Sequence, residues 1–266
     1  MRKIALLFFI NILLFSVCQA EIISGRVDRF EENYQNKIID SKTKKPVSNA
    51  KISIPDLNIQ TYSDSNGIFK LNADINDKTI LFVEKEGYKV FSLTIDNNVL
   101  KNPLKLGIEQ TSPFDLQISE GVIHLGDNMF SSNSANSGDF RLYANGHFFS
   151  KTFSKPTSAQ NQDIIVKIGT IIGLDTKKAK ERGQNRISHV YSSPAEVFVN
   201  GHKIGNLELN DDNIEVLVPK NILKETNELV IKTGRNLFQT EYIDYDDIEL
   251  ANIRIEAKGR QKFARY

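Results

Sequence analysis

The stretch IIDSKTKKPVSNAKISI, residues 38–54, places an apolar pair, a charged turn and a proline ahead of an alternating segment. Pro46 has its φ fixed near about −65° and leads into the next element, while the polar residues before it turn the chain. Alternation puts Ile52 and Ile54 on one face, away from the polar residues beside them. The stretch therefore predicts two β-strands joined by a turn.

A second turn and strand follow in YSDSNGIFKL, residues 62–71. Gly67 is the natural residue for a positive φ in this turn, and Phe69 is expected to return to the core. Apolar runs at 79–83 and 90–95, joined through EKEGYK, predict two further strands. The first part of the chain is therefore expected to be a small antiparallel β domain.

These segments, with VEKEGYKVFSLTI, resemble the carboxypeptidase regulatory-like domain, a small transthyretin-like β-sandwich. The resemblance covers 37–107 and departs at Lys37, where a glycine is usual. It implies an accessory module, with no catalytic residues to carry over. Such modules are often joined to secreted enzymes, receptors and adhesins.

Short strands separated by Gly, Asn and Asp turns also dominate 115–258. The pair Asn200-Gly201 in VFVNGHKIG favours a type I′ hairpin, and short helical pieces are expected after Pro219 and at 176–183. VFVNGHKIG, VPKNILKETNELVIKTG and YIDYDDIELANIRIEA resemble, in this order, the galactose-binding-like jelly roll of carbohydrate-binding modules and secreted glycosidases. We therefore expect an all-β chain of two β-sandwich domains, a transthyretin-like sandwich and then a jelly roll.

The first residues have the layout of a secretory signal peptide, with a positive start, the apolar run IALLFFINILLF and a small-residue exit. The run is shorter than the ~20 residues that a bilayer requires, so we expect cleavage after Ala20 and no membrane span in the mature chain. Lipid attachment at Cys18 is the less favoured alternative, because Val17 fits a lipoprotein signal poorly. The protein is expected to be secreted or periplasmic.

The domain organisation follows from these segments and from the two prolines in KNPLKLGIEQTSPFD, at 101–115. We expect a signal peptide at 1–20, an N-terminal extension at 21–36, the first sandwich at 37–107, a linker at 108–114, the second sandwich at 115–258 and a tail at 259–266.

The charge balance gives no case for a nucleic-acid or anionic membrane partner. The chain has 34 basic and 33 acidic residues, and without Arg2 and Lys3 the basic count falls to 32. A nearly neutral chain has no overall attraction for phosphate-rich surfaces. We expect a glycan or a cell-surface protein as the partner.

Several members of the jelly-roll fold hold a structural calcium ion where the first and last strands meet. The candidate ligands here are Asp127 and Asn128 near the first strand, and Asp247 and Glu249 at the last. Ca²⁺ takes about six to eight hard oxygen ligands, and Asp247 and Glu249 share a face of an alternating strand. The alternative is a solvated acidic rim.

Sugar binding uses aromatic faces and planar polar groups, and the chain has no Trp, the best stacking residue. RLYANGHFF and the later loop at 173–193 supply the remaining candidates. The candidate ligand-binding residues are Arg141, Tyr143, Asn145, His147 and Tyr191. The alternative is that the aromatic residues belong to the core or to strand edges, and that ANGH is a hairpin turn.

Catalytic motifs are missing from the sequence. The four histidines form no H-E-x-x-H pair, no G-x-S-x-G is present, and Cys18 lies in the expected signal. Asp246-Asp247 is a weak candidate for paired carboxylates, because spacing along the chain does not give their separation in space. We expect a non-enzymatic binding protein with no catalytic residues. A structural or assembly subunit and a carbohydrate-active enzyme are the alternatives.

Overall fold

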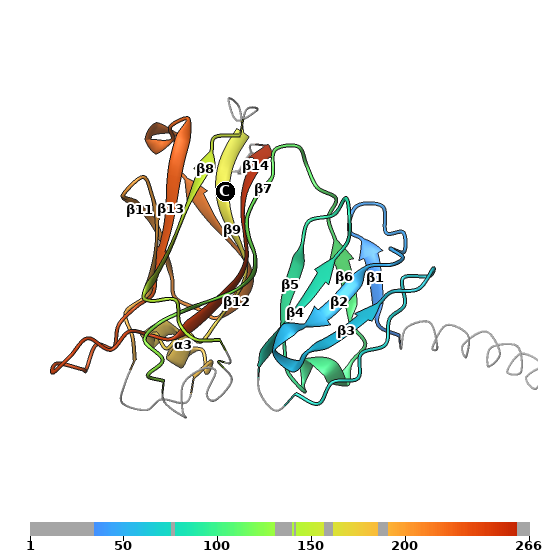
Figure 1. Ribbon diagram of the computed structural model, residues 1–266, viewed down its shortest axis with the longest axis horizontal. Coiled ribbons are helices and arrows are strands. Elements are labelled where there is room, and N and C mark those ends of the chain that lie inside the picture. The colour runs from blue at the N-terminus through green and yellow to red at the C-terminus, as the bar shows by residue number, and fades with distance from the viewer. Residues whose placement is uncertain are drawn as a thin grey trace, which may run out of the picture.

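The computed structural model of the protein describes residues 35–75, 78–130, 140, 142–156, 162–185 and 191–259. These residues form two β-sandwich domains that lie side by side (Figure 1). The expected all-β chain with two sandwiches is therefore confirmed. The signal peptide predicted at 1–20, including Cys18, lies outside the described residues. Across the described ranges, no helix has the length and apolar character needed to cross a bilayer.

The first domain is a four-stranded antiparallel sheet in the order β3-β2-β4-β5, packed against the parallel pair β1-β6. Buried apolar side chains of both layers form one core between them. The elements are β1 (Lys37–Asp40), β2 (Lys51–Ile54), η1 (Pro55–Leu57), β3 (Ile59–Tyr62), β4 (Thr79–Glu84), β5 (Phe91–Ile95), η2 (Val99–Lys101) and β6 (Lys105–Ile108).

Asp40 stabilises the turn that follows β1 in the first domain. Its carboxylate accepts hydrogen bonds from the backbone N–H groups of Lys42 and Thr43, at 3.0 and 2.7 Å. It also accepts one from the Tyr88 hydroxyl and one from the Gln110 side-chain amide. The Thr43 N–H contributes most to lowering the pKa of Asp40 to about 2, against the opposing effect of burial. One carboxylate thus joins the turn to two later parts of the chain.

Gly67 lets the second turn approach β1 closely. Its φ is +74°, its carbonyl accepts a hydrogen bond from Ile38 N, and a Cβ at this position would lie 2.4 Å from Ile38 O. The strand expected after this turn is reduced to one isolated bridge between Ile68 and Lys37. Phe69 is nevertheless buried as expected, so the segment enters the core without extending a sheet.

The second domain pairs two antiparallel four-stranded sheets, β11-β10-β13-β8 and β12-β9-β14-β7. The hairpin expected at Asn200-Gly201 is confirmed, with φ values of 52° and 79°. So are the helical pieces, although the one after Pro219 is a single 3₁₀ turn. The elements are β7 (Leu116–Leu125), β8 (Phe148–Ser154), β9 (Gln162–Ile172), α3 (Lys177–Glu181), β10 (Ala195–Val199), β11 (His202–Leu207), β12 (Asp211–Val218), η3 (Lys220–Ile222), β13 (Thr226–Lys232) and β14 (Ile248–Gly259).

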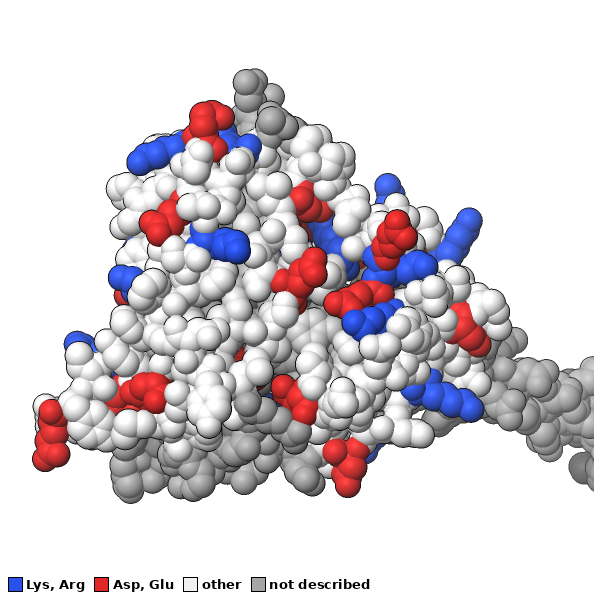
Figure 2. All heavy atoms as spheres, in the orientation of Figure 1, with Lys and Arg blue, Asp and Glu red and all other residues white. Residues whose placement is uncertain are grey.

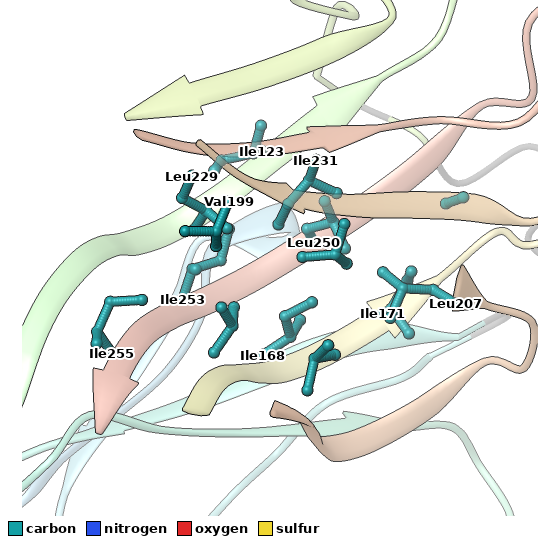
Figure 3. Close-up of a cluster of buried hydrophobic side chains, with 14 of the residues drawn as sticks. Ile123, Ile168, Ile171, Val199, Leu207, Leu229, Ile231, Leu250, Ile253 and Ile255 are labelled. Carbon is teal, nitrogen blue, oxygen red and sulfur yellow. The ribbon is translucent and has the colours of Figure 1, made fainter. Parts of the chain in front are cut away.

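The core of the second domain lies between its two sheets (Figure 3). Ile168 and Leu250 enter it from β9 and β14, and Val199, Leu229 and Ile231 face them from the other sheet. All five side chains are fully buried. Burial of an aliphatic side chain of this size contributes about 1.5–3 kcal/mol, so this core, and no disulfide, holds the domain together.

The first domain packs on the outer face of the β12-β9-β14-β7 sheet (Figure 1). Ile80 and Phe82 of β4 form a buried apolar cluster there with Ile172 and Ala251. At one side of this cluster, the Thr94 backbone N–H and hydroxyl both donate to the Asp212 carboxylate at 3.0 Å. The two domains therefore share an interface with an apolar centre and hydrogen bonds beside it.

An ionic network borders the apolar centre. Lys89 of the first domain lies 3.2 Å from each of three carboxylates, those of Glu109, Asp115 and Glu256. Arg254 donates to Glu256 and to the Val90 carbonyl, at 3.0 and 2.7 Å. Because Arg254 and Glu256 are buried, they stabilise the interface only while these partners remain.

Gly67→Ala is expected to destabilise the first domain, because the new methyl group meets Ile38 O in addition to the strain of a positive φ. Gly87→Ala is the matched control, since Gly87 has a φ of +80° and nothing within 4 Å of its added Cβ. Denaturant unfolding should show that Gly67→Ala lowers the free energy of unfolding by roughly 1–3 kcal/mol more than Gly87→Ala does. Equal losses for the two variants would contradict this account of the turn.

Acidification is expected to weaken the domain interface through Glu256. Burial alone would raise the pKa of Glu256, but the charges of Lys89 and Arg254 outweigh it and lower the pKa below its ordinary value. A lowered folded-state pKa gives stability that is present above the unfolded pKa of about 4.3 and is lost as pH falls through the folded value.

The variant Glu256→Gln should therefore be less stable than wild type at pH 7, by about 2 kcal/mol in denaturant unfolding. The difference should shrink below about pH 4. Glu120→Gln, on an exposed side chain, serves as the control and should cost little at either pH. A wild-type advantage that stays constant down to pH 3 would rule out the ionic contribution.

Candidate functional site

The loops that could carry function meet at one end of the second sandwich. Leu125, the last residue of β7, pairs with Ile248, the first of β14, and Ile172 at the end of β9 pairs with Glu249. Antiparallel pairing thus brings the segments after β7 and β9 beside the segment before β14. The start of β8 lies opposite the end of β13 at the same end, which we call the loop end (Figure 1).

A buried ion pair lies beneath the loop end. His124 Nε2 lies 2.8 Å from Asp247 Oδ1, and neither side chain is exposed to solvent. His124 Nδ1 lies 2.5 Å from the Leu142 carbonyl, which can only accept, so Nδ1 carries a proton. Burial disfavours the imidazolium, but the hydrogen bonds to Asp247 and to Leu142 O outweigh it and raise the pKa of His124.

Gly126 allows the turn after β7 to wrap the Asp247 carboxylate. A Cβ on Gly126 would lie 2.4 Å from Asp247 Oδ1. The same oxygen accepts a hydrogen bond from Asn128 N at 2.9 Å. Asp247 therefore joins the turn after β7 to the segment before β14, across more than a hundred residues of sequence.

The structure brings three of the predicted calcium ligands together, namely Asp127, Asn128 and Asp247, but the side-chain oxygens of Asp127 and Asn128 accept from backbone groups. Asp127 accepts from Met129 N and Tyr245 N, at 3.0 and 2.9 Å, and Asn128 Oδ1 accepts from Ala144 N at 2.9 Å. Such contacts are typical of turn-forming side chains.

The fourth predicted ligand, Glu249, is fully buried and pairs with His124 across the sheet. Within the described part of the chain, no three or more His, Cys, Asp or Glu residues are grouped so that they could hold a metal ion. As arranged here, the oxygens of Asp127 and Asn128 do not fit a calcium site, and calcium binding stays a prediction.

The carboxylate pair considered for catalysis, Asp246 and Asp247, is buried. Asp246 accepts a hydrogen bond from Asp175 N at 3.2 Å. Burial and the nearby charge of Asp175 raise the pKa of Asp246 well above its ordinary value. Burial thus favours the neutral form of Asp246, and both carboxyl groups lie away from solvent.

Three of the predicted ligand-binding residues lie on the segment that leads into β8. Tyr143 is the most exposed large apolar side chain in the described residues, at 86%. Asn145 is exposed and donates its backbone N–H to His124 O. His147 stacks on Tyr245, with ring centroids 4.5 Å apart and planes 12° from parallel. Tyr143, Asn145 and His147 thus share one surface segment.

The two remaining predicted residues are Tyr191 and Arg141. Tyr191 packs edge-on against Phe238, with centroids 5.1 Å apart, and its carbonyl accepts from Leu237 N. Arg141 lies outside the described residues. The ligand-binding set therefore divides between the segment before β8 and the neighbourhood of Phe238.

A loop at residues 235–245, outside the predicted ligand-binding set, carries further exposed apolar side chains. Leu237, Phe238, Tyr242 and Ile243 are all exposed on it, and Tyr245 at its end supports the His147 ring. The signal in the sequence is NLFQTEYI, residues 236–243, in which two apolar pairs flank three polar residues and follow neither a strand nor a helix period.

A concave site lies between the domains. This groove, of about 240 Å³, is lined by the interface network and by Lys167, Glu215 and Lys258. The Glu215 carboxylate pairs with Lys167 and with Lys258. Four basic side chains and three carboxylates line the groove, and Asp115 beside Lys89 supplies a fourth carboxylate, so most of these charges are paired with one another.

The ion pair beneath the loop end predicts a pH dependence of stability. Because the folded-state pKa of His124 is raised, its contribution is complete below the unfolded value of about 6.5 and is lost as pH rises through the folded value. His124→Gln should lower the free energy of unfolding by about 3 kcal/mol at pH 6 and by less at pH 9. The exposed His202 gives the control His202→Gln, whose small effect should not change with pH. A loss for His124→Gln that is larger at pH 9 than at pH 6 would contradict the charged pair.

Comparison with known proteins places the first domain. Residues 35–117 match the family model of the CarboxypepD_reg-like domain, which covers β1 to β6 and reaches the start of β7. No curated protein matches the chain. The resemblance stated for 37–107 is therefore confirmed, and for the second domain the two antiparallel sheets agree with a β-sandwich. The chain thus joins a CarboxypepD_reg-like domain to a second β-sandwich that carries the loop end.

Proposed function

We propose that the protein is a secreted, non-enzymatic binding protein that holds a glycan or a cell-surface protein with the loop end of its second sandwich. The first domain acts as a stiff spacer in this proposal. The second domain is taken as a galactose-binding-like jelly roll, on the sequence resemblance and on its two four-stranded antiparallel sheets. Secretion rests on the signal-like layout of residues 1–20.

The main support for this proposal is the position of the exposed apolar side chains. Among the described residues, eleven large apolar side chains are exposed, and eight of them belong to the loop end. A concentration of exposed apolar groups on one part of a surface is typical of an interaction site. The eight are Met129, Leu142, Tyr143, Phe148, Leu237, Phe238, Tyr242 and Ile243.

Contacts beneath these side chains hold the loops in place, which favours binding by a preorganised surface. Leu142, next to Tyr143, is held through its carbonyl by His124, and His147 is stacked on Tyr245. Loops fixed on a rigid sandwich lose little freedom when a ligand binds, which improves affinity. The arrangement therefore suits recognition better than chemistry, because the eight exposed apolar side chains are aromatic, aliphatic or thioether groups.

Tyr143→Ala is the direct test of the loop end. The full mature chain is applied to a glycan array and, labelled, to whole cells, and the variant should bind its ligand at least about tenfold more weakly. Tyr62→Ala is the matched control, because Tyr62 is also an exposed tyrosine but lies on β3 of the first domain. Both variants should keep the wild-type melting temperature.

Two results would overturn the proposed function. One is wild-type protein that binds neither the array nor the cells. The other is binding that Tyr62→Ala weakens and Tyr143→Ala does not.

A further inference from the structure

The loop between β13 and β14 is closed at its base by paired residues. Arg235 and Tyr245 form an isolated β-bridge. Asn236 N donates to Asp244 O at 2.8 Å, and the Asn236 side-chain amide donates to the Asp244 carboxylate at 3.0 Å. The segment projects from the loop end as a narrow excursion (Figure 1). We call residues 235–245 the apolar loop.

Side-chain hydrogen bonds also shape the outer part of the apolar loop. Asn236 Oδ1 accepts from Phe238 N at 2.9 Å. Gln239 Oε1 accepts from the N–H groups of Thr240 and Glu241, at 2.9 and 3.1 Å. The backbone is therefore held by its own turn residues, and it presents its apolar side chains in a set arrangement.

The apolar side chains of this loop are exposed although the loop is ordered by hydrogen bonds. Leu237, Phe238, Tyr242 and Ile243 all remain in solvent, within seven residues of sequence. Two of the four are aliphatic, and aliphatic groups offer a sugar neither a stacking face nor a hydrogen bond. Their chemistry fits an apolar groove of another protein.

The charges of the apolar loop further restrict the class of partner that it could bind. Arg235 and Asp244 both stand at its base, while the outer residues 237–243 carry Glu241 and no basic residue. Figure 2 shows red acidic side chains among uncoloured ones on the projection at the far lower left. An acidic loop is repelled by anionic lipid, and it is attracted to a basic rim.

The groove between the domains of a second copy of this chain is a poor binding site for the loop. The groove between the domains is lined by Lys89, Lys167, Glu215 and other charged side chains that pair with one another. Inserting leucine and isoleucine there would break these ion pairs without burying apolar surface on the partner.

We propose that the apolar loop is a docking element that inserts its exposed side chains into an apolar groove with a basic rim on a partner protein. This inference rests on the proposed function, since it names the partner class for the same loop end. Leu237 and Ile243 supply the apolar contact, and the exposed Glu241 supplies the charge.

The test uses photo-crosslinking from the full chain in the cells that produce it. A benzophenone amino acid replaces Ile243, which is 56% exposed, or Leu217 on β12, which is 57% exposed and serves as the matched control. Position 243 should yield an adduct with one protein, and position 217 should not. Mapped adduct peptides should surround an apolar groove flanked by lysine or arginine.

The partner found in this way is then purified for binding measurements. Ile243→Ser should weaken its binding at least about tenfold, whereas Leu217→Ser should leave it unchanged. Glu241→Gln should reduce binding at 50 mM salt and have less effect at 500 mM, because salt screens the attraction to a basic rim.

Several outcomes would overturn the docking element. They are an adduct with lipid, with glycan or with a second copy of this chain, an adduct whose peptides form an acidic or polar surface, and no adduct at position 243. If Tyr143→Ala weakens ligand binding while Ile243→Ser does not, the docking element fails and the proposed function stands. If the wild-type chain binds no ligand, the proposed function fails as well.

Discussion

Burial of β14 on both faces is the constraint on which the rest of the structure depends. Its inward residues, such as Leu250 and Ile253, fill the core of the second sandwich, while Ala251, Arg254 and Glu256 on the outward side are covered by the first domain. A strand buried in this way must pair every polar group that it carries. The contacts of Arg254 and Glu256 with the first domain meet this requirement, so the domain interface also completes the strand.

Close approach of the two domains requires small residues and an irregular strand. A Cβ on Gly169 of β9 would lie 2.3 Å from Ser92 Oγ of the first domain. Opposite it, Asn252 has a φ of 58° at a β-bulge, and its amide donates to the Val90 carbonyl. A bulge redirects a side chain out of the ordinary alternation, and here it supplies a hydrogen bond across the interface.

Local features of the fold could be predicted from the sequence, and contacts between distant segments could not. The opening turn and the Asn200-Gly201 hairpin depend on the conformational preferences of neighbouring residues, so their residue types predict them. In the run IELANIRIEA, the alternation of apolar and polar residues predicted the strand. It did not predict that the first domain covers the polar face of this strand. The His124–Asp247 pair depends on the register between β7 and β14, which residue types alone do not specify. The exposure of the apolar loop could not be predicted, because exposed and buried aromatic residues look alike in a sequence.

The position of the interface leaves the loop end free, and the buried ion pair prepares it. The first domain covers the outer face of one sheet and does not extend over the loops (Figure 1). Below them, His124 binds the Leu142 carbonyl beside Tyr143, while Asp247 binds Asn128 N. Since both loops are tied to one buried pair, their surface side chains are positioned before any ligand arrives, and less conformational entropy is lost on binding. The buried His124–Asp247 pair thus determines how the exposed apolar side chains of the loops are positioned.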